Sequence, residues 1–387
     1  MRQLRFVLFC LLSAQSVSAA TRISKATGNF TAAGTWGTVE AGASAIQVTR
    51  SASTNTTTSY VYSSAFTCTN LDVIEGVLVF GRQLTVTGTV SIALSEDNGT
   101  TATRELAVNA TDLSTSDSPH FFLFTSALTC DGGTDYKVGV KGSSAANAVF
   151  YRDGTAGNWF RVLRTNATGA PGAADLLYVT GDMTGVGTGN SFTVTMDNTA
   201  ATTFGAVSVT SLGIGHRGTV TWGVAAATNY LFTIAGFVEV FGGGFWNQGT
   251  SGARCTSDST CKLNFDAATN VDSGFICQDG GTCNVNGTTL TTTSTLLNTD
   301  EAAAQTVLGV AAQLPTTGEI TIASTTRTAN QTEKRTISTS DATTVTVTAG
   351  LTNAHSGTSP TQAEVVYLTR NSVIQGESDS LQGFIRC

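Results

Sequence analysis

Charged side chains are scarce in this sequence of 387 residues, where they make up 12%, and there are only 4 prolines and 3 histidines. Coiled coils and helical bundles need Glu, Lys, Arg and Leu at helical spacing, so this composition argues against them. An excess of positive charge is also absent, because the formal net charge is -7. A chain of that sign has no electrostatic basis for binding phosphate backbones, so nucleic acid is not an expected partner.

Several catalytic signatures are missing too, since no HExxH, P-loop or GxSxG pattern occurs. Lone histidines in loops and strands, such as His120 and His216, are usually structural. A pair of carboxylates could support glycoside hydrolysis. The candidates on or near predicted strands are Glu239, Asp266, Asp272 and Asp279. Solvated turn carboxylates are the simpler interpretation, so the residues favour a non-enzymatic protein, with an enzyme as the alternative, and no catalytic residue is predicted.

Long apolar runs are absent after residue 20, and a bilayer span needs roughly 18 apolar residues, so no membrane span is expected. Residues 1–20 combine two arginines, an apolar run from Phe6 to Leu12 and small residues up to Ala20. This arrangement is typical of a secretory signal peptide. We therefore predict a protein that is secreted or displayed at the cell surface.

What the sequence does contain is glycine, with 41 residues, together with much threonine and serine, as in an all-β protein. From Tyr60 to about Thr165, short alternating segments follow one another between turn clusters such as 97–99 and 131–133. This spacing predicts an antiparallel β-sandwich over residues 21–175. Residues 176–204 are interpreted as a linker and a first strand, with the glycine-rich stretch from Gly181 in the linker.

A different rhythm begins near residue 205. Three segments each place a short strand, a glycine turn and a second short strand in succession, with the turns at Gly218, Gly244 and Gly281. A unit of this size cannot bury its own apolar face, and stacking of successive copies is the usual solution. The sequence therefore predicts a short parallel β-helix over residues 205–387, with a coil of about 20 to 26 residues.

The cysteines offer a test of that prediction. Cys255 and Cys277 are separated by 22 positions, as are Cys261 and Cys283. Residues one coil apart in a parallel stack lie about 4.8 Å from each other, a distance that a disulfide tolerates. Those two pairings are favoured, and closures within each C-x5-C segment are the alternative. A zinc site is less favoured, because the spacing is wider than usual.

Two further cysteines, Cys68 and Cys130, could form a disulfide within the sandwich. Cys387 is then left over at the C-terminus, either free or intermolecular.

Two resemblances to known families follow from these segments. The run from Thr85 through Val140 is similar to the jelly-roll modules with which secreted proteins bind carbohydrate. From Gly318 to Gly376 the chain resembles the G-eight domain of fibrocystin and of the cell-migration-inducing and cell-surface hyaluronidases. The matching stretches are Gly318-Glu319-Ile320, Gln331-Thr332-Glu333, His355, Ala363-Glu364-Val365 and Leu368-Thr369-Arg370-Asn371. The likeness extends over about residues 205–377.

The G-eight resemblance implies an extracellular right-handed β-helix in a protein that handles or binds glycans. In the large members of that family further coils follow the strand that ends the likeness, whereas here the printed chain stops 11 residues after Gly376. Catalytic residues of those coils have no matching positions, so none is transferred.

Exposed aromatic side chains are the natural sugar-binding residues, because their faces stack on sugar rings while nearby polar groups orient the hydroxyls. In the sandwich the candidates are Tyr60, Tyr62, Tyr151, Trp159 and Arg161.

Two further tryptophans, Trp222 and Trp246, lie in matching coils. They are interpreted either as a stacked pair at the surface or as core residues.

No cofactor is predicted, although calcium is possible. Asp131 and Asp135, or Glu96 and Asp97, could supply oxygen ligands. Ordinary turn chemistry explains both clusters more simply.

The leading functional hypothesis is a secreted or surface-displayed adhesion module that binds a glycan or a cell-surface polysaccharide. One alternative is an incomplete polysaccharide-degrading β-helix enzyme of the hyaluronidase or lyase kind. Another is a structural fibre or tail component, in which the open end of the helix associates with another copy, because unpaired strand edges invite association.

Overall fold

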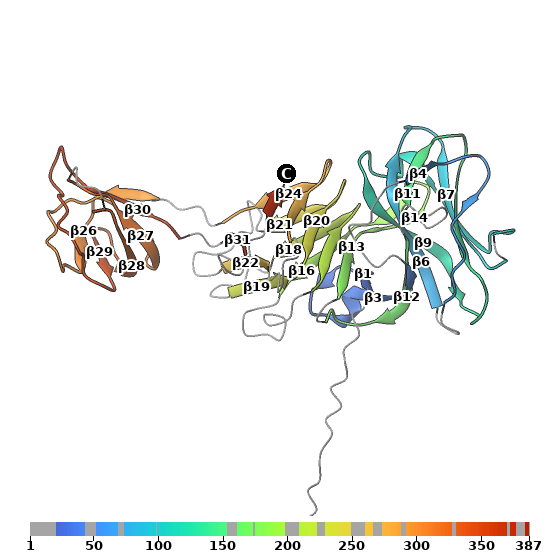
Figure 1. Ribbon diagram of the computed structural model, residues 1–387, viewed down its shortest axis with the longest axis horizontal. Coiled ribbons are helices and arrows are strands. Elements are labelled where there is room, and N and C mark those ends of the chain that lie inside the picture. The colour runs from blue at the N-terminus through green and yellow to red at the C-terminus, as the bar shows by residue number, and fades with distance from the viewer. Residues whose placement is uncertain are drawn as a thin grey trace, which may run out of the picture.

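The computed structural model describes residues 21–42, 52–68, 73–97, 99–152, 161–172, 175–197, 209–222, 229–248, 260–265, 273–287, 292–326, 330–369, 372–376 and 384–386. Strands dominate this part of the chain, which otherwise has two short 3-10 turns, η1 (Ala33–Thr35) and η2 (Ala110–Asp112). The predicted all-β fold class is therefore confirmed (Figure 1). No helix among these residues has the length and apolar character of a membrane span.

Two sheets with antiparallel pairing form the N-terminal part, as the alternating segments predicted. The first contains β3 (Trp36–Gly42), β4 (Ala52–Asn55), β6 (Val73–Gln83), β9 (Ser118–Thr129), β11 (Ala148–Arg152) and β12 (Arg161–Thr168). The second has the order β5 (Val61–Tyr62), β10 (Lys137–Gly142), β7 (Thr89–Ser95) and β8 (Arg104–Asn109). Val77 and Val79 of the first sheet share one buried core with Ile92 and Val138 of the second.

The predicted disulfide between Cys68 and Cys130 is confirmed. Its Cα atoms lie 6.2 Å apart, and both cysteines belong to the sandwich core.

Parallel ladders make up the following part, which we call the coil stack. One ladder runs through β13 (Leu176–Val179), β17 (Ser211–Ile214), β20 (Phe237–Val240), β23 (Gly274–Cys277) and β32 (Phe384–Arg386). A second runs through β2 (Gly28–Asn29), β16 (Phe192–Met196), β18 (Gly218–Trp222), β21 (Phe245–Gln248) and β24 (Thr282–Val285). The third joins β19 (Asn229–Ile234), β22 (Thr260–Phe265) and β31 (Ser372–Gly376). Successive glycine-turn segments thus lie next to one another, as the sequence predicted.

Inward side chains of all three ladders form a single core. Trp222 and Trp246 belong to it, with 2% and 0% of their surface exposed and ring centroids 6.0 Å apart. Of the two interpretations of this pair, core packing is therefore correct.

The length of a coil differs from the prediction, and the favoured disulfides are wrong for that reason. Val220 pairs with Trp246, 26 positions later, and Trp246 pairs with Cys283, 37 positions later. A separation of 22 residues therefore does not bring two cysteines together. Cys277 is bonded to Cys283 instead, with Cα atoms 6.4 Å apart.

This bond is the local closure that was the alternative, and it excludes both favoured pairings. Cys261 is also in a disulfide. Cys255 and Cys387 lie outside the described residues.

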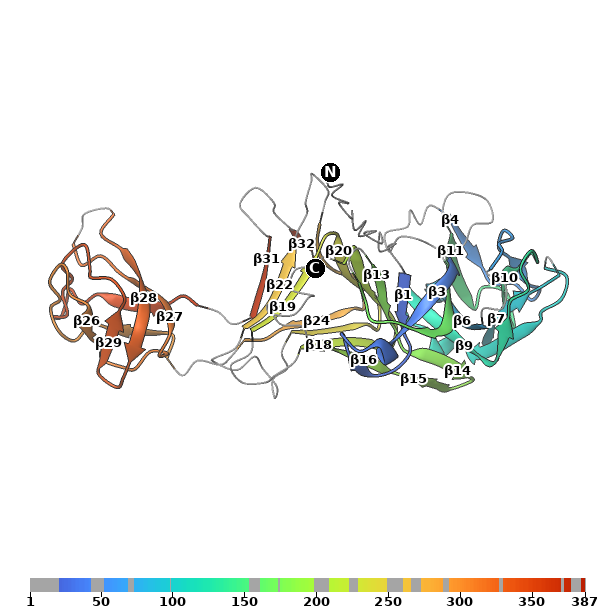
Figure 2. The same cartoon turned by 90° about the horizontal axis from the view of Figure 1, so that it is seen from below.

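The C-terminal sheet departs from the prediction of one continuous parallel stack over residues 205–387. It has the order β25 (Ser294–Leu296), β30 (Glu364–Tyr367), β27 (Gly318–Ile322), β28 (Glu333–Ser340), β29 (Thr344–Val347) and β26 (Val307–Gly309). All its pairings are antiparallel, and its core is its own (Figure 2). The chain then returns to the coil stack at β31, so this sheet is inserted between two strands of the stack.

The sandwich and the coil stack share a continuous sheet. The first strand, β1 (Thr21–Ser24), pairs with β3 on one side and with β13 on the other. Residues 182–190, expected in a linker, instead form the hairpin β14 (Asp182–Gly185) and β15 (Thr188–Asn190), and β14 extends the sandwich sheet by pairing with β9. The linker prediction was therefore wrong.

Candidate functional site

The structure brings together two of the five predicted sugar-binding residues. Tyr60 and Tyr62 lie side by side, with ring centroids 5.5 Å apart. Tyr151 lies on the other sheet, in β11, where its ring packs against Phe80 at 5.8 Å. Arg161 belongs to β12, although its side chain, like all of Trp159, lies outside the described residues.

Strand alternation explains why both tyrosines point outward. Val61 packs against the sandwich core, so its neighbours Tyr60 and Tyr62 face the opposite side of the sheet. The short strand β5 is an edge strand that pairs with β10, where Tyr62 lies opposite Gly139.

Glycine leaves the space that these rings occupy. A Cβ atom added to Gly139 would lie 2.6 Å from Cε1 of Tyr62 and 3.0 Å from Cδ1 of Tyr60. Gly99 approaches the other side of the Tyr62 ring, where an added Cβ would lie 3.2 Å from Cδ2. The rings therefore rest directly on backbone, and any larger side chain at position 139 would push them away from the sheet.

Two charged side chains complete this surface. The Lys141 Nζ atom lies 4.3 Å from the centroid of the Tyr60 ring and 2.9 Å from Oε1 of Glu105. Lys141 and Glu105 are both partly exposed, on β10 and β8. We call the outer surface carrying Tyr60, Tyr62, Lys141 and Glu105 the tyrosine face.

Electrostatics keeps the groups of the tyrosine face in fixed protonation states. Burial, followed by the nearby Glu105 carboxylate, raises the pKa of the Tyr60 phenol far above its ordinary value. Burial alone would raise the pKa of Glu105, but hydrogen bonds led by the one from Lys141 lower it overall. The face therefore presents neutral phenols beside one cation and one carboxylate at neutral pH.

Sequence reasoning missed Lys141 and Glu105. The signal that could have found them is strand register, because Lys141 lies opposite Ser91, and Glu105 opposite Ala93. Small residues on β7 thus separate the two charged ones and form the floor of the face.

The predicted calcium ligands lie on an ordinary turn. Thr134 donates its backbone N–H to the carbonyl oxygen of Asp131, and the backbone N–H of Asp131 donates to Oη of Tyr136. Within the described ranges no three His, Cys, Asp or Glu side chains are grouped closely enough to hold a metal ion.

Two histidines that the sequence kept separate are neighbours in the structure. The rings of His120, in β9, and His216, in a turn of the coil stack, have centroids 5.1 Å apart. Burial lowers the pKa of both, to about 4 for His216, and Nε2 of His120 accepts the backbone N–H of Ser114. Two neutral imidazoles with these partners pack the junction between sandwich and coil stack.

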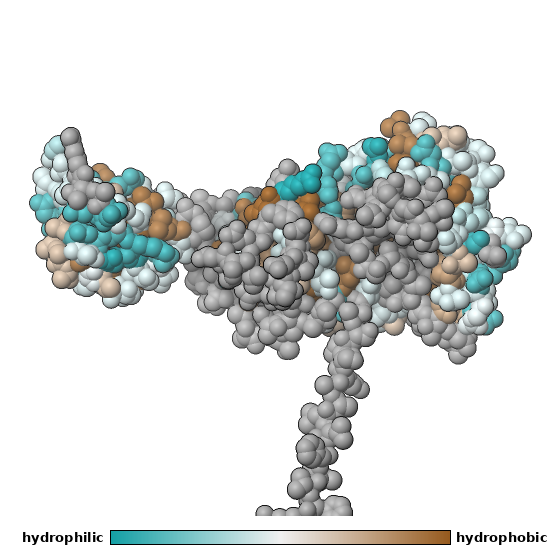
Figure 3. All heavy atoms as spheres, viewed as in Figure 1, coloured by the Kyte–Doolittle hydropathy of each residue, from teal (hydrophilic) through white to brown (hydrophobic). Residues whose placement is uncertain are grey.

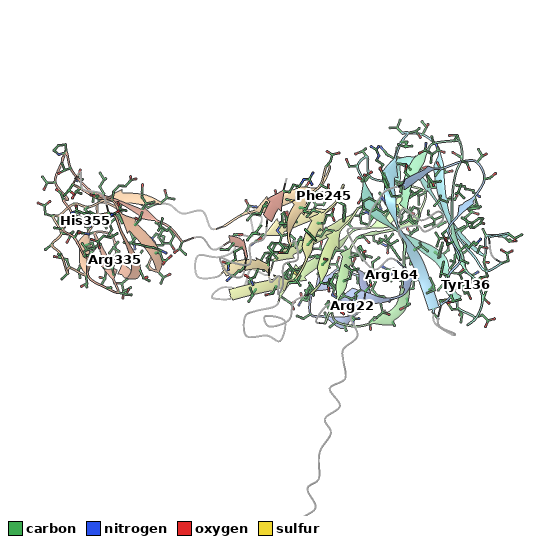
Figure 4. All side chains as sticks on the ribbon, in the orientation of Figure 1. Arg22, Tyr136, Arg164, Phe245, Arg335 and His355 are labelled. Atoms are coloured by element: carbon green, nitrogen blue, oxygen red, sulfur yellow. A yellow bond between two sulfur atoms is a disulfide. The ribbon has the colours of Figure 1, made fainter. Side chains whose placement is uncertain are left out.

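The third histidine is part of a buried polar cluster in the C-terminal sheet. Nε2 of His355 lies 3.0 Å from Oε1 of Glu333, which also accepts the backbone N–H of Asn353 and pairs with Arg335. Figure 4 labels His355 and Arg335 within this sheet. The Glu333 carboxylate is fully engaged, so the cluster is structural.

The carboxylates considered for hydrolysis do not form a groove. Glu239 is 1% exposed and accepts a hydrogen bond from Nε2 of Gln278, while Asp279 lies on an exposed turn. Asp266 and Asp272 lie outside the described residues. In the view of Figure 3, hydrophilic and hydrophobic residues are interspersed over the sandwich.

Comparisons of the chain with protein-family models, with curated proteins and with solved structures found no match. The function must therefore be argued from the tyrosine face and from the chemistry around it.

Proposed function

We propose that this protein is secreted or displayed at the cell surface, is not an enzyme, and binds a glycan through the tyrosine face. The observation that supports this most is the pairing of Tyr60 and Tyr62 on an outward sheet surface. Aromatic faces stack on the apolar faces of sugar rings, and adjacent polar groups fix the orientation of the hydroxyls.

The geometry of the face suits a chain of sugars. The two ring centroids are 5.5 Å apart, about the length of one pyranose unit, so neighbouring sugars could each meet one tyrosine. Lys141 can donate to a hydroxyl and Glu105 can accept from one, on the same side of the sheet.

The compartment is part of the same proposal. Disulfides such as Cys68–Cys130 persist in oxidising environments, which agrees with a secreted chain. The leader of residues 1–20 lies outside the described residues and stays a prediction. The G-eight resemblance supports the same conclusion, because that family belongs to extracellular proteins that handle glycans.

The test is retention on immobilised polysaccharides and on a glycan array. Tyr62→Ala should abolish retention, because it removes one of the stacking faces. Gly139→Ala should weaken it, since the added methyl group displaces both rings while the strand remains.

Two variants serve as matched controls. Phe245→Ala removes an aromatic that is 41% exposed on the coil stack, and Gly34→Ala adds a methyl group where nothing lies within 4 Å. Both should bind like the unmodified protein. Equal retention of Tyr62→Ala and Phe245→Ala would refute the role of the tyrosine face.

Self-association is a second candidate, supported by the end of the coil stack. Strands β24, β31 and β32 are the last strands of their ladders among the described residues. Val285 and Ile385 on two of them are 46% and 60% exposed. Sedimentation at rising concentration should show dimers that Ile385→Asp prevents; a monomer at all concentrations would contradict this.

A further inference from the structure

A hollow lies where the sandwich meets the coil stack. It has a volume of about 200 Å³ and is lined by Arg82, Ser116, Asp117, Gln278 and Asp279. Arg82 and the 116–117 segment belong to the sandwich, whereas Gln278 and Asp279 form a turn of the coil stack after β23. We call it the junction hollow.

Backbone contacts hold its two sides together. The N–H of Gly242 donates to the carbonyl oxygen of Asp117, and Ser116 Oγ donates to Oδ2 of Asp279 at 2.7 Å. Gly280, at a φ of +74°, lets the segments approach, because an added Cβ would lie 2.8 Å from Ser116 Oγ. The walls of the hollow are therefore fixed relative to each other.

The turn that supplies Gln278 and Asp279 is fastened on both flanks. The Cys277–Cys283 disulfide closes it, and the backbone N–H of Gln278 donates to the carbonyl oxygen of Val240 in the preceding coil. Gln278 is also anchored by its side chain, whose Nε2 donates to the buried Glu239 at 2.5 Å. Side chains on such a turn lose little freedom when a ligand binds, which favours affinity.

The chemistry of the lining identifies a class of ligand. Asp117 and Asp279 accept hydrogen bonds, Arg82 donates them, and Arg82 Nε lies only 3.4 Å from Oδ1 of Asp117. A bare divalent cation is disfavoured by that guanidinium, and an anion by the two carboxylates. A neutral polyol satisfies both kinds of group, because each hydroxyl donates and accepts.

An aromatic side chain stands next to this polar set. The Tyr151 phenol interacts with Asp117 and Arg82, and its ring packs on Phe80. We propose that the junction hollow binds a single sugar residue, held by Asp279, Asp117 and Arg82. The hollow lies on a different sheet from the tyrosine face, so this site neither requires nor implies binding there.

The experiment uses saturation-transfer NMR on the full chain with the methyl glycosides of glucose, galactose and mannose. At least one glycoside should give a signal, and Asp279→Ala and Arg82→Ala should each weaken its binding at least tenfold. The Cys277→Ser/Cys283→Ser double variant should weaken it as well, because the turn is then no longer closed.

Controls separate this site from the tyrosine face. Asp131→Ala removes a carboxylate from a distant turn, and Tyr62→Ala alters only the tyrosine face; both should leave the signal unchanged. A signal that survives both Asp279→Ala and Arg82→Ala overturns the inference, as does a lack of signal with all three glycosides at millimolar concentration. A signal lost only in Tyr62→Ala also overturns it and assigns the sugar to the tyrosine face.

Discussion

At the scale of single residues, Glu333 shows how one buried carboxylate can organise a small sheet. Its two oxygens accept the backbone N–H groups of Thr352 and Asn353, at 2.7 and 2.6 Å, and also contact His355 and Arg335. Burial opposes ionisation, but these hydrogen bonds outweigh it and lower the pKa of Glu333 to about 2. The charged carboxylate is thus the form that the fold requires.

This shift predicts acid sensitivity with a defined direction. Because the pKa of Glu333 is lower in the folded than in the unfolded state, its stabilisation is complete above about pH 4.5 and is lost as the pH falls toward 2. Glu333→Gln should lower the free energy of unfolding of the C-terminal sheet by about 2 kcal/mol at pH 7 and flatten this dependence.

Thermal unfolding between pH 7 and pH 2, followed by circular dichroism, measures both effects. Glu319→Gln is the control, because that carboxylate is 45% exposed and pairs only with the exposed Lys334. If Glu333→Gln were as stable as this control at pH 7, the role assigned to the carboxylate would be wrong.

At the scale of elements, strand β21 separates core from surface within two positions. Trp246 is fully buried between Trp222 and Phe275, whereas its neighbour Phe245 is 41% exposed. Trp246→Ala should destabilise the coil stack by about 4 kcal/mol, and Phe245→Ala by less than about 1 kcal/mol. Chemical denaturation of both variants compares them directly, and similar losses would contradict the inward orientation of Trp246.

The same elements show what the sequence could and could not predict. Alternation around Ile92 and Leu94 predicted the sandwich, and the glycine turns at Gly218, Gly244 and Gly281 predicted the neighbouring coils. Coil length was missed because it grows from 26 residues to 37 between one coil and the next, and a fixed cysteine spacing cannot reveal such growth.

The C-terminal sheet was missed for a different reason. Alternating strands have the same pattern whether their partners are parallel or antiparallel, so residues 318–340 fitted either arrangement. A turn signal was present at Asn330, whose φ of 69° suits the connection between β27 and β28. Half of the tyrosine face was predictable from exposed aromatics, whereas Lys141 and Glu105 required strand register.

At the scale of the whole molecule, the C-terminal sheet has a core separate from that of the coil stack. Leu308, Ile320, Val345 and Val365 are fully buried within it. Residues 292–369 expressed alone should therefore unfold cooperatively, as monitored by circular dichroism. Leu308→Asp should abolish the transition, and a fragment without any cooperative transition would show that the sheet needs the coil stack.

The insertion of this sheet has a mechanical consequence. The chain leaves the stack after β24 and rejoins it at β31 and β32, which pair with β22 and β23. A tensile load applied between β1 and β32 would therefore be borne first by the hydrogen bonds of these last two strands. Until they peel away, the inserted sheet is shielded from the force, and its later unravelling would release a reserve of length under strain.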